Sequence, residues 1–260
     1  MVEFTHQDLQ GSRFEDVHLG GTRFDDVHLG DSRFQNVWFG GARLSGVGLV
    51  DVEINGEIDN LRINGVDVGP LIEAELNRLH PDRPMMRPRD ADGFREAWDI
   101  LERLWAETVD RARALSPALL HERVDEQWSF IETLRHLVFA TDAWVYRAVL
   151  GEPAPWHPLD LPHDDMADAP GVPRDRTVQP SLDEVLVLRA DRMGTVRRVL
   201  ADLTDEQLGG MTEPVTEPGY PESESFPVAR CLRAVVNEEW EHRLYAERDL
   251  AVLVARQPGR

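Results

Sequence analysis

Residues 128–151 read WSFIETLRHLVFATDAWVYRAVLG and carry the pattern of a buried helix. Apolar side chains recur at steps of three and four, which places them along one face of a helix. Ser129 and Glu132 form a Ser-x-x-Glu capping box at the start, and Gly151 marks the end. The stretch therefore predicts a helix over about residues 130–150.

The same period predicts three further helices in the second part of the chain. We expect them at about residues 92–115, 182–202 and 226–255. Four long amphipathic helices with one long connection are typical of an all-α four-helix bundle, here over residues 91–260. The connection, residues 151–180, is rich in proline, and unstructured connections of that length are usually functional lids or disordered.

The beginning of the chain has a different repeat. Residues 11–40 read GSRFEDVHLGGTRFDDVHLGDSRFQNVWFG, in which a ten-residue unit splits into two fives. Large apolar residues stand at every fifth position from Phe4 to Ile54. A period of five fits neither a helix nor an ordinary strand, but it suits a chain that turns a corner every five residues. The stretch resembles the pentapeptide-repeat family, which implies a right-handed quadrilateral β-helix over residues 1–69.

Between the two parts, residues 70–90 are expected to be a linker with a short helix, since Pro70 suits a first helical turn and three later prolines break the pattern. The expected β-helix would present a row of arginines on its outer face: Arg13, Arg23, Arg33 and Arg43. These arginines are either a docking surface for a protein partner or solvated ladders beside acidic residues.

Composition limits the classes of partner. The chain has 260 residues and a formal net charge of −20, and all of its basic side chains except histidine are arginine. An acidic chain is a poor ligand for nucleic acid or an anionic membrane, since both bind basic patches. One cysteine excludes an intrachain disulfide and a Cys-rich zinc module. With neither a secretory signal nor a span of about 20 apolar residues, we expect a cytoplasmic protein.

A carboxylate and an imidazole interrupt the apolar stripe of the last predicted helix. Glu238 and His242 are four residues apart, so both side chains point the same way and suit two ligands of one metal ion. His136, on the helix over 130–150, lies among small residues that leave room beside it. If these faces meet, the three side chains form a site with open positions for Zn, Ni or Fe(II). The alternatives are a hydrogen-bonded core histidine, a solvated Glu–His pair, and an inward-facing Glu239 in place of Glu238.

Residues 128–151 and 236–253 resemble the DinB-like family of metal-binding four-helix bundles. The family's first histidine follows a Trp-Ser start, as His136 follows Trp128 and Ser129 here. Its last helix carries His-x-x-x-His, whose second histidine matches His242 and whose first is replaced by Glu238. The resemblance implies a divalent metal, Zn or Ni before Fe, held by His136, Glu238 and His242.

The family includes transferases and isomerases that use a low-molecular-weight thiol such as mycothiol, and many of its members form homodimers. The resemblance therefore implies a metal-dependent transferase or hydrolase that activates a thiol or water against a small electrophilic substrate. Arg189, His157 and His163 could contribute to substrate binding or to a lid, or they could be ordinary surface residues. The rival hypothesis is a non-catalytic interaction protein that docks through the β-helix and has a structural or vestigial metal site.

Overall fold

In the computed structural model the chain divides into two units, residues 1–57 and 58–260. The structure describes residues 3–15, 17–34, 37–56, 58–164 and 166–256. Each unit is described by itself.

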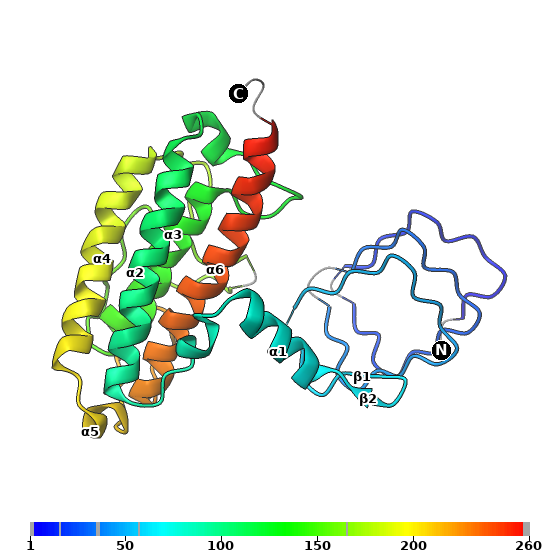
Figure 1. The fold of residues 1–260 in the computed structure, drawn as a ribbon, viewed down its shortest axis with the longest axis horizontal. Helices are drawn as coiled ribbons and strands as arrows, with labels where there is room; N and C mark the ends of the chain where they lie inside the picture. Colours follow the sequence, from blue (N-terminus) through cyan, green and yellow to red (C-terminus); the bar gives the residue numbers. More distant parts are fainter. Residues whose placement is uncertain (1–2, 16, 35–36, 57, 165, 257–260) are drawn as a thin grey trace. The chain divides into compact units, whose positions relative to one another are not determined.

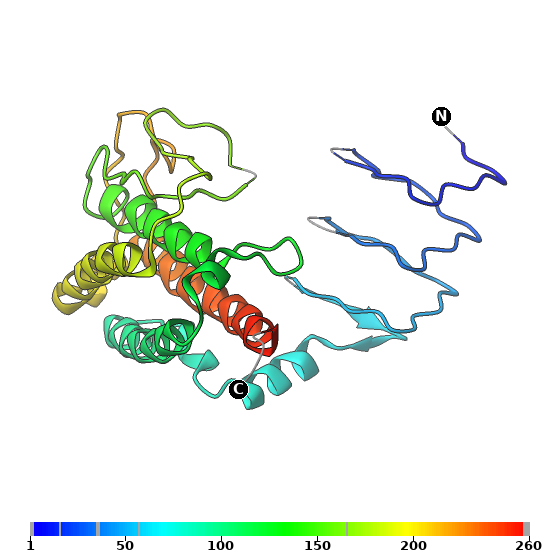
Figure 2. The same ribbon diagram turned by 90° about the horizontal axis from the view of Figure 1, so that it is seen from above.

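The first unit is a succession of similar turns (Figure 2). Hydrogen bonds close some of these turns ten residues apart, from the Ser12 amide to the Leu9 carbonyl and from the Thr22 amide to the Leu19 carbonyl, both 3.0 Å. Backbone φ is positive at many positions five residues apart, as at Gly41 and Gly46. The five-residue period therefore fixes where the chain changes direction.

The predicted right-handed quadrilateral β-helix is wrong. Within the described part of residues 3–56 there is no strand, and the strands found elsewhere form one open two-stranded sheet (Figure 1). The apolar side chains expected to face inward, from Phe4 to Ile54, are 41–63% exposed. A β-helix needs strand pairing between coils and a filled interior. The turns satisfy the repeat without either, so the predicted docking surface has no β-helix beneath it, and Arg13 forms an exposed ion pair with Glu15.

A β-hairpin lies at residues 62–67, where the β-helix was predicted to continue to residue 69. Strands β1 (Arg62–Ile63) and β2 (Val66–Asp67) pair antiparallel, with Ile63 opposite Val66. Asn64 and Gly65 connect them with φ values of 51° and 83°, the left-handed pair that a two-residue hairpin turn requires. Helix α1 (Gly69–Leu79) follows, with Pro70 in its first turn, and then the 3₁₀ turn η1 (Arg83–Met86).

The predicted four-helix bundle is confirmed (Figure 1). Its helices are α2 (Ala91–Arg113), α3 (Phe130–Thr141), α4 (Leu182–Asp202) and α6 (Val228–Arg256). Helices α3 and α2 each pack against both α4 and α6. Shorter elements are the 3₁₀ turn η2 (Pro117–His121), the π-helical turn η3 (Asp142–Arg147) that extends α3, and α5 (Asp205–Leu208).

Apolar stripes close the core of the bundle. On α2 a stripe of four side chains is buried, Phe94, Trp98, Leu101 and Trp105, none more than 3% exposed. Each such side chain stabilises the fold by about 1.5–3 kcal/mol relative to an exposed one. In the described part of the chain, no helix has the length and apolar character needed to cross a membrane.

Two buried arginines tie long connections to α3 and its extension. The Arg135 guanidinium donates to the carbonyls of Leu159 at 2.7 Å and Val178 at 3.1 Å, both in the connection between η3 and α4. Arg147 donates to the carbonyl of Pro221 at 3.2 Å, in the connection between α5 and α6. Both arginines are at most 1% exposed, so these bonds are sheltered from water. The connections thereby have fixed positions beside α3.

Candidate metal centre

Helix α3 presents His136 toward α6. The helix begins at a capping box in which the Glu132 amide donates to Ser129 Oγ at 3.3 Å, and the Ser129 amide donates to Glu132 Oε2 at 2.9 Å. His136 follows two turns later, with its side chain 6% exposed. Its Nδ1 lies 2.9 Å from the Leu161 carbonyl oxygen. Since that oxygen can only accept, Nδ1 carries the proton and Nε2 is left with a free lone pair.

Helix α6 brings a carboxylate and a second imidazole to this nitrogen. Glu238 Oε2 lies 3.3 Å from His136 Nε2 and 3.1 Å from His242 Nδ1. The side chains of Glu238 and His242 are 32% and 19% exposed. One potential ligand atom from each of the three residues falls within 4.8 Å of the other two. The metal-site triad, as we call these residues, thus converges at the seam between α3 and α6.

The environment favours the ionised form of Glu238. Burial by itself would raise the pKa of this carboxyl, but its contacts with the imidazoles of His136 and His242 lower it well below its usual range. The ring of Trp128 lies 4.6 Å from that of His136 and 5.9 Å from that of His242. The Trp128 indole N–H donates to Asp164 at 3.3 Å, so a residue of the connection between η3 and α4 meets the ring beside the triad.

Two imidazole nitrogens and one carboxylate oxygen are a donor set that Zn, Ni and Fe(II) accept, and three protein ligands leave coordination positions for water or substrate. The residues present therefore fit a divalent ion.

A comparison with protein families matches residues 100–246 to the DinB superfamily, more than half of the chain. The chain belongs to the DinB superfamily. The DinB match begins inside α2, ends inside α6 and includes the whole triad. It gives no support for a pentapeptide-repeat domain in the first unit. Comparisons with curated proteins and with solved structures found no match.

In this DinB protein, the structure brings together the three residues that the sequence singled out, and their binding of a metal stays a prediction. Of the two adjacent glutamates that could face inward, both do, and they meet different partners. Glu238 joins the triad, while Glu239, 1% exposed, accepts hydrogen bonds from Arg189 Nη1 and Nη2 at 3.0 and 2.8 Å. The guanidinium also lies over the Trp105 ring, 5.0 Å from its centroid. Arg189 is therefore engaged in a buried ion pair.

The two loop histidines predicted as substrate or lid residues lie outside the triad. His157 Nδ1 accepts a hydrogen bond from the Leu159 amide at 3.1 Å. The His163 ring meets that of Tyr220 edge-on, with centroids 6.3 Å apart. The role of His157 and His163 in substrate binding or in a lid stays a prediction.

Sequence reasoning missed a buried group beside this site: Asp142, Asp160 and Arg192. Asp142 stands in the apolar run LVFATDAW, so the signal that singled out Glu238, a carboxylate where an apolar residue is expected, was also present there. The contact of the Leu161 carbonyl with His136 could not be predicted in this way, since every residue has a backbone carbonyl whatever its side chain.

Proposed function

We propose that this DinB protein binds one divalent metal ion through His136, Glu238 and His242, and that it uses the ion to activate a small-molecule nucleophile. The observation that supports the proposal most directly is the position of the Glu238 carboxylate, within 3.3 Å of an imidazole nitrogen from each of two helices. Zn or Ni suits the donor set best, and Fe(II) is compatible with it.

The surroundings of the triad support this assignment. Metal-binding histidines commonly donate their other ring N–H to a carbonyl or carboxylate, which fixes the tautomer. His136 does so to Leu161. The lowered pKa of Glu238 keeps this ligand anionic, so that it offsets part of the charge of a divalent ion.

The chemistry follows from the open positions. A bound divalent ion lowers the pKa of a thiol or of water, supplying a nucleophile at neutral pH. In the chain itself, His136 and His242 supply neutral donors and Glu238 supplies the negative charge. The Trp128 ring lies beside both imidazoles, with centroids 4.6 Å from that of His136 and 5.9 Å from that of His242. We propose a small electrophilic molecule as substrate, with either a low-molecular-weight thiol such as mycothiol or water as the attacking group.

Metal content tests the first part of this proposal. The full chain, purified without a histidine tag and reconstituted with zinc, should retain close to one equivalent after gel filtration. His136→Asn should retain much less, because a ligand is lost. His18→Asn, which changes an exposed histidine of the first unit, is the matched control and should behave as wild type. Retention below about a tenth of an equivalent in the wild type would exclude the site.

Thiol dependence tests the second part. The zinc-loaded protein should turn over a generic electrophile, such as 1-chloro-2,4-dinitrobenzene, faster with mycothiol than without it if transfer is the reaction. Hydrolysis of an activated ester in the absence of thiol would indicate water as the nucleophile. Rates equal to those of His136→Asn in both assays would contradict an enzymatic role for the triad.

A further inference from the structure

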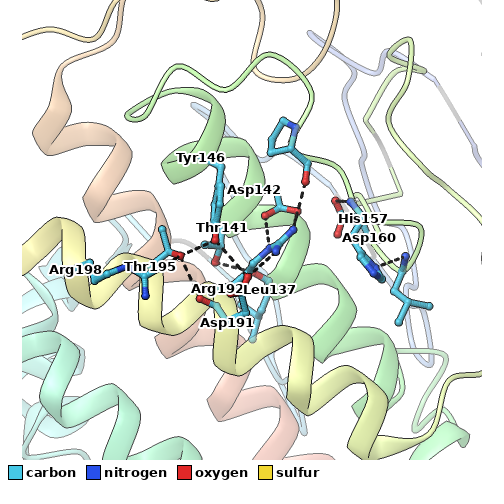
Figure 3. Close-up of polar contacts among 12 residues, drawn as sticks. Leu137, Thr141, Asp142, Tyr146, His157, Asp160, Asp191, Arg192, Thr195 and Arg198 are labelled. Atoms are coloured by element: carbon cyan, nitrogen blue, oxygen red, sulfur yellow. Dashed lines mark hydrogen bonds and ion pairs between the residues drawn. The ribbon is translucent and has the colours of Figure 1, made fainter.

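Two carboxyl groups are buried against each other where the connection after η3 returns to the bundle (Figure 3). Asp142 stands at the start of η3 and Asp160 in the connection, and both are 0% exposed. Each carboxyl is close enough to the other for a shared hydrogen bond between them to shift the pKa of both. Two ionised carboxylates have no hydrogen to share, so this bond requires a proton on one of them.

Arg192 is the cation that pairs with Asp142 and also acts electrostatically on Asp160. Arg192, on α4, donates to both oxygens of Asp142, at 2.7 and 3.0 Å. Asp160 Oδ2 accepts from the His157 amide at 3.1 Å, while its buried Oδ1 lacks a protein donor among the described residues. If both carboxyls were ionised, the pair would keep an uncompensated negative charge away from water, which is costly. One proton removes that charge, and on Oδ1 it would give this buried atom a hydrogen to donate.

Among the described residues, the other ionisable groups around the pair form no ion pair with either carboxyl, although the Arg135 charge acts on Asp160 from a greater distance. They are Arg135 from α3, Tyr146 from η3, Glu152 and His157 from the connection, and Asp191 from α4. The Arg135 guanidinium is occupied by backbone carbonyls. Burial and the charge of Arg192 lower the pKa of His157, which keeps its ring neutral. Burial, reinforced by the neighbouring Asp142, raises the pKa of Asp160 far above its ordinary value.

One peptide unit connects Asp160 to the backbone contact that His136 makes. Asp160 directly precedes Leu161, which is 0% exposed and whose carbonyl accepts from His136 Nδ1 at 2.9 Å. We propose that Asp142 and Asp160 share one proton at neutral pH, and that this bond fastens residues 157–161 to α3, which makes Asp160 a positioning residue for His136. The role of Asp160 in positioning His136 as a metal ligand rests on the proposed function, whereas the proton-dependent fastening does not.

The direction of the pH dependence follows from proton counting. When residues 157–161 detach, Asp160 meets water and ionises with an ordinary pKa of about 3.9, so opening releases a proton. Opening therefore becomes easier as the pH rises above that value, by about tenfold per pH unit, until the attached pair itself loses its proton. The fastening is strongest at acidic pH and weakest at alkaline pH.

Hydrogen exchange of the metal-free full chain measures this opening. The Asp160 amide, which donates to the His157 carbonyl at 2.9 Å, and the His157 amide, which donates to Asp160, report on the segment. Between about pH 6 and about pH 8 their protection factors, corrected for intrinsic exchange, should fall about tenfold per pH unit in the wild type. Asp160→Asn, whose amide can donate to Asp142 but does not titrate, should retain the protection and lose the pH dependence.

The matched control is Asp168→Asn, the same change in the same connection at a side chain that is 93% exposed, and it should keep the wild-type slope. A slope that persists in Asp160→Asn, or wild-type protection that does not change with pH, would overturn the proposal. Independently of any variant, ¹³C NMR of the aspartate carboxyls should find one of the two groups still protonated at pH 7 in the wild type, and two ionised groups would also overturn it. These readouts need no metal, so they are unaffected if the triad proves not to bind one.

Discussion

Glu238 sets the charge of the candidate site. It is the one acidic member of the triad, and its carboxylate contacts both imidazoles. A neutral side chain of the same shape would preserve the packing of α6 and remove the charge that a cation needs. Affinity for a metal should therefore respond to this residue far more than stability does.

We expect Glu238→Gln to lower the affinity for zinc by at least about 100-fold, since changes in outer-shell groups alone cost 10–100-fold. The measurement is competition against a chromophoric chelator. Glu241→Gln, on the same helix and outside the triad, is the matched control and should change the affinity less than about threefold. Equal affinities in the two variants would remove Glu238 from the ligand set.

The neighbouring Arg189–Glu239 pair has a structural role, since its side chains are 4% and 1% exposed. Glu239→Gln should lower the free energy of unfolding by about 3–5 kcal/mol, because it leaves a buried guanidinium without its counter-charge. Chemical denaturation measures the loss. Glu107→Gln, which breaks an ion pair with Arg103 whose side chains are both 52% exposed, should cost less than about 1 kcal/mol. Similar losses in both variants would contradict the assignment.

At the scale of elements, α3 organises the second unit. It carries His136 and Arg135, and its π-helical extension η3 carries Asp142 and Arg147. A π-helical turn inserts an extra residue into a helix and shifts the side chains that follow, and such turns are frequent at functional sites. Here the shifted segment contacts both long connections, since Arg147 donates to the carbonyls of Pro153 and Pro221.

The two buried arginines should affect the connections differently, because Arg135 binds carbonyls only of the connection before α4, whereas Arg147 binds Pro153 of that connection and Pro221 of the one before α6. Arg135→Met should speed proteolytic cleavage within residues 155–180 by about tenfold or more, because the carbonyls that it binds lose buried donors. Arg147→Met should instead expose residues 211–227. Mass spectrometry of early fragments distinguishes the two. The variants serve as each other's control, and identical cleavage patterns would show that the arginines act only on global stability.

Sequence patterns predicted elements whose local signal and packing agree. The helices of the bundle followed from a 3.6-residue period, and the box at Ser129 placed the start of α3 correctly. The five-residue period of the first unit predicted corners, but a repeat of turn positions does not determine whether strands pair between coils. The Asn64-Gly65 turn, a strong hairpin signal, was overlooked because the repeat was extended through it.

The candidate site was predictable where side-chain type departs from its surroundings. Glu238 and His242 interrupt an apolar stripe at helical spacing, and His136 lies among small residues. The partner of Arg189 could not be read from the sequence, since both Glu238 and Glu239 were available to α6. Contacts between distant segments, such as that of Leu161 with His136, depend on the path of a connection that has no periodic signal.

At the scale of the whole molecule, the two units differ in how they bury apolar side chains. The core clusters of the bundle and the triad lie within residues 58–260. Phenylalanines of the first unit, such as Phe14 and Phe24, are 59% and 61% exposed. The stability of the bundle should therefore not require the first unit.

Deletion of residues 1–57 should leave the thermal unfolding midpoint of the bundle within about 3 °C of the full chain, because no core residue of the bundle is removed. Zinc affinity should change less than about twofold. Circular dichroism and the chelator competition check both values. An aggregated product, or one that no longer binds zinc while the full chain does, would show that the units depend on each other.

The most direct test of the central claim is anomalous scattering from zinc-loaded crystals of the full chain, collected on both sides of the zinc absorption edge. We expect one strong peak about 2.0–2.2 Å from a nitrogen of His136, a nitrogen of His242 and a carboxylate oxygen of Glu238. Absence of a peak between α3 and α6 in crystals that contain zinc, or a peak that contacts only other residues, would contradict the account.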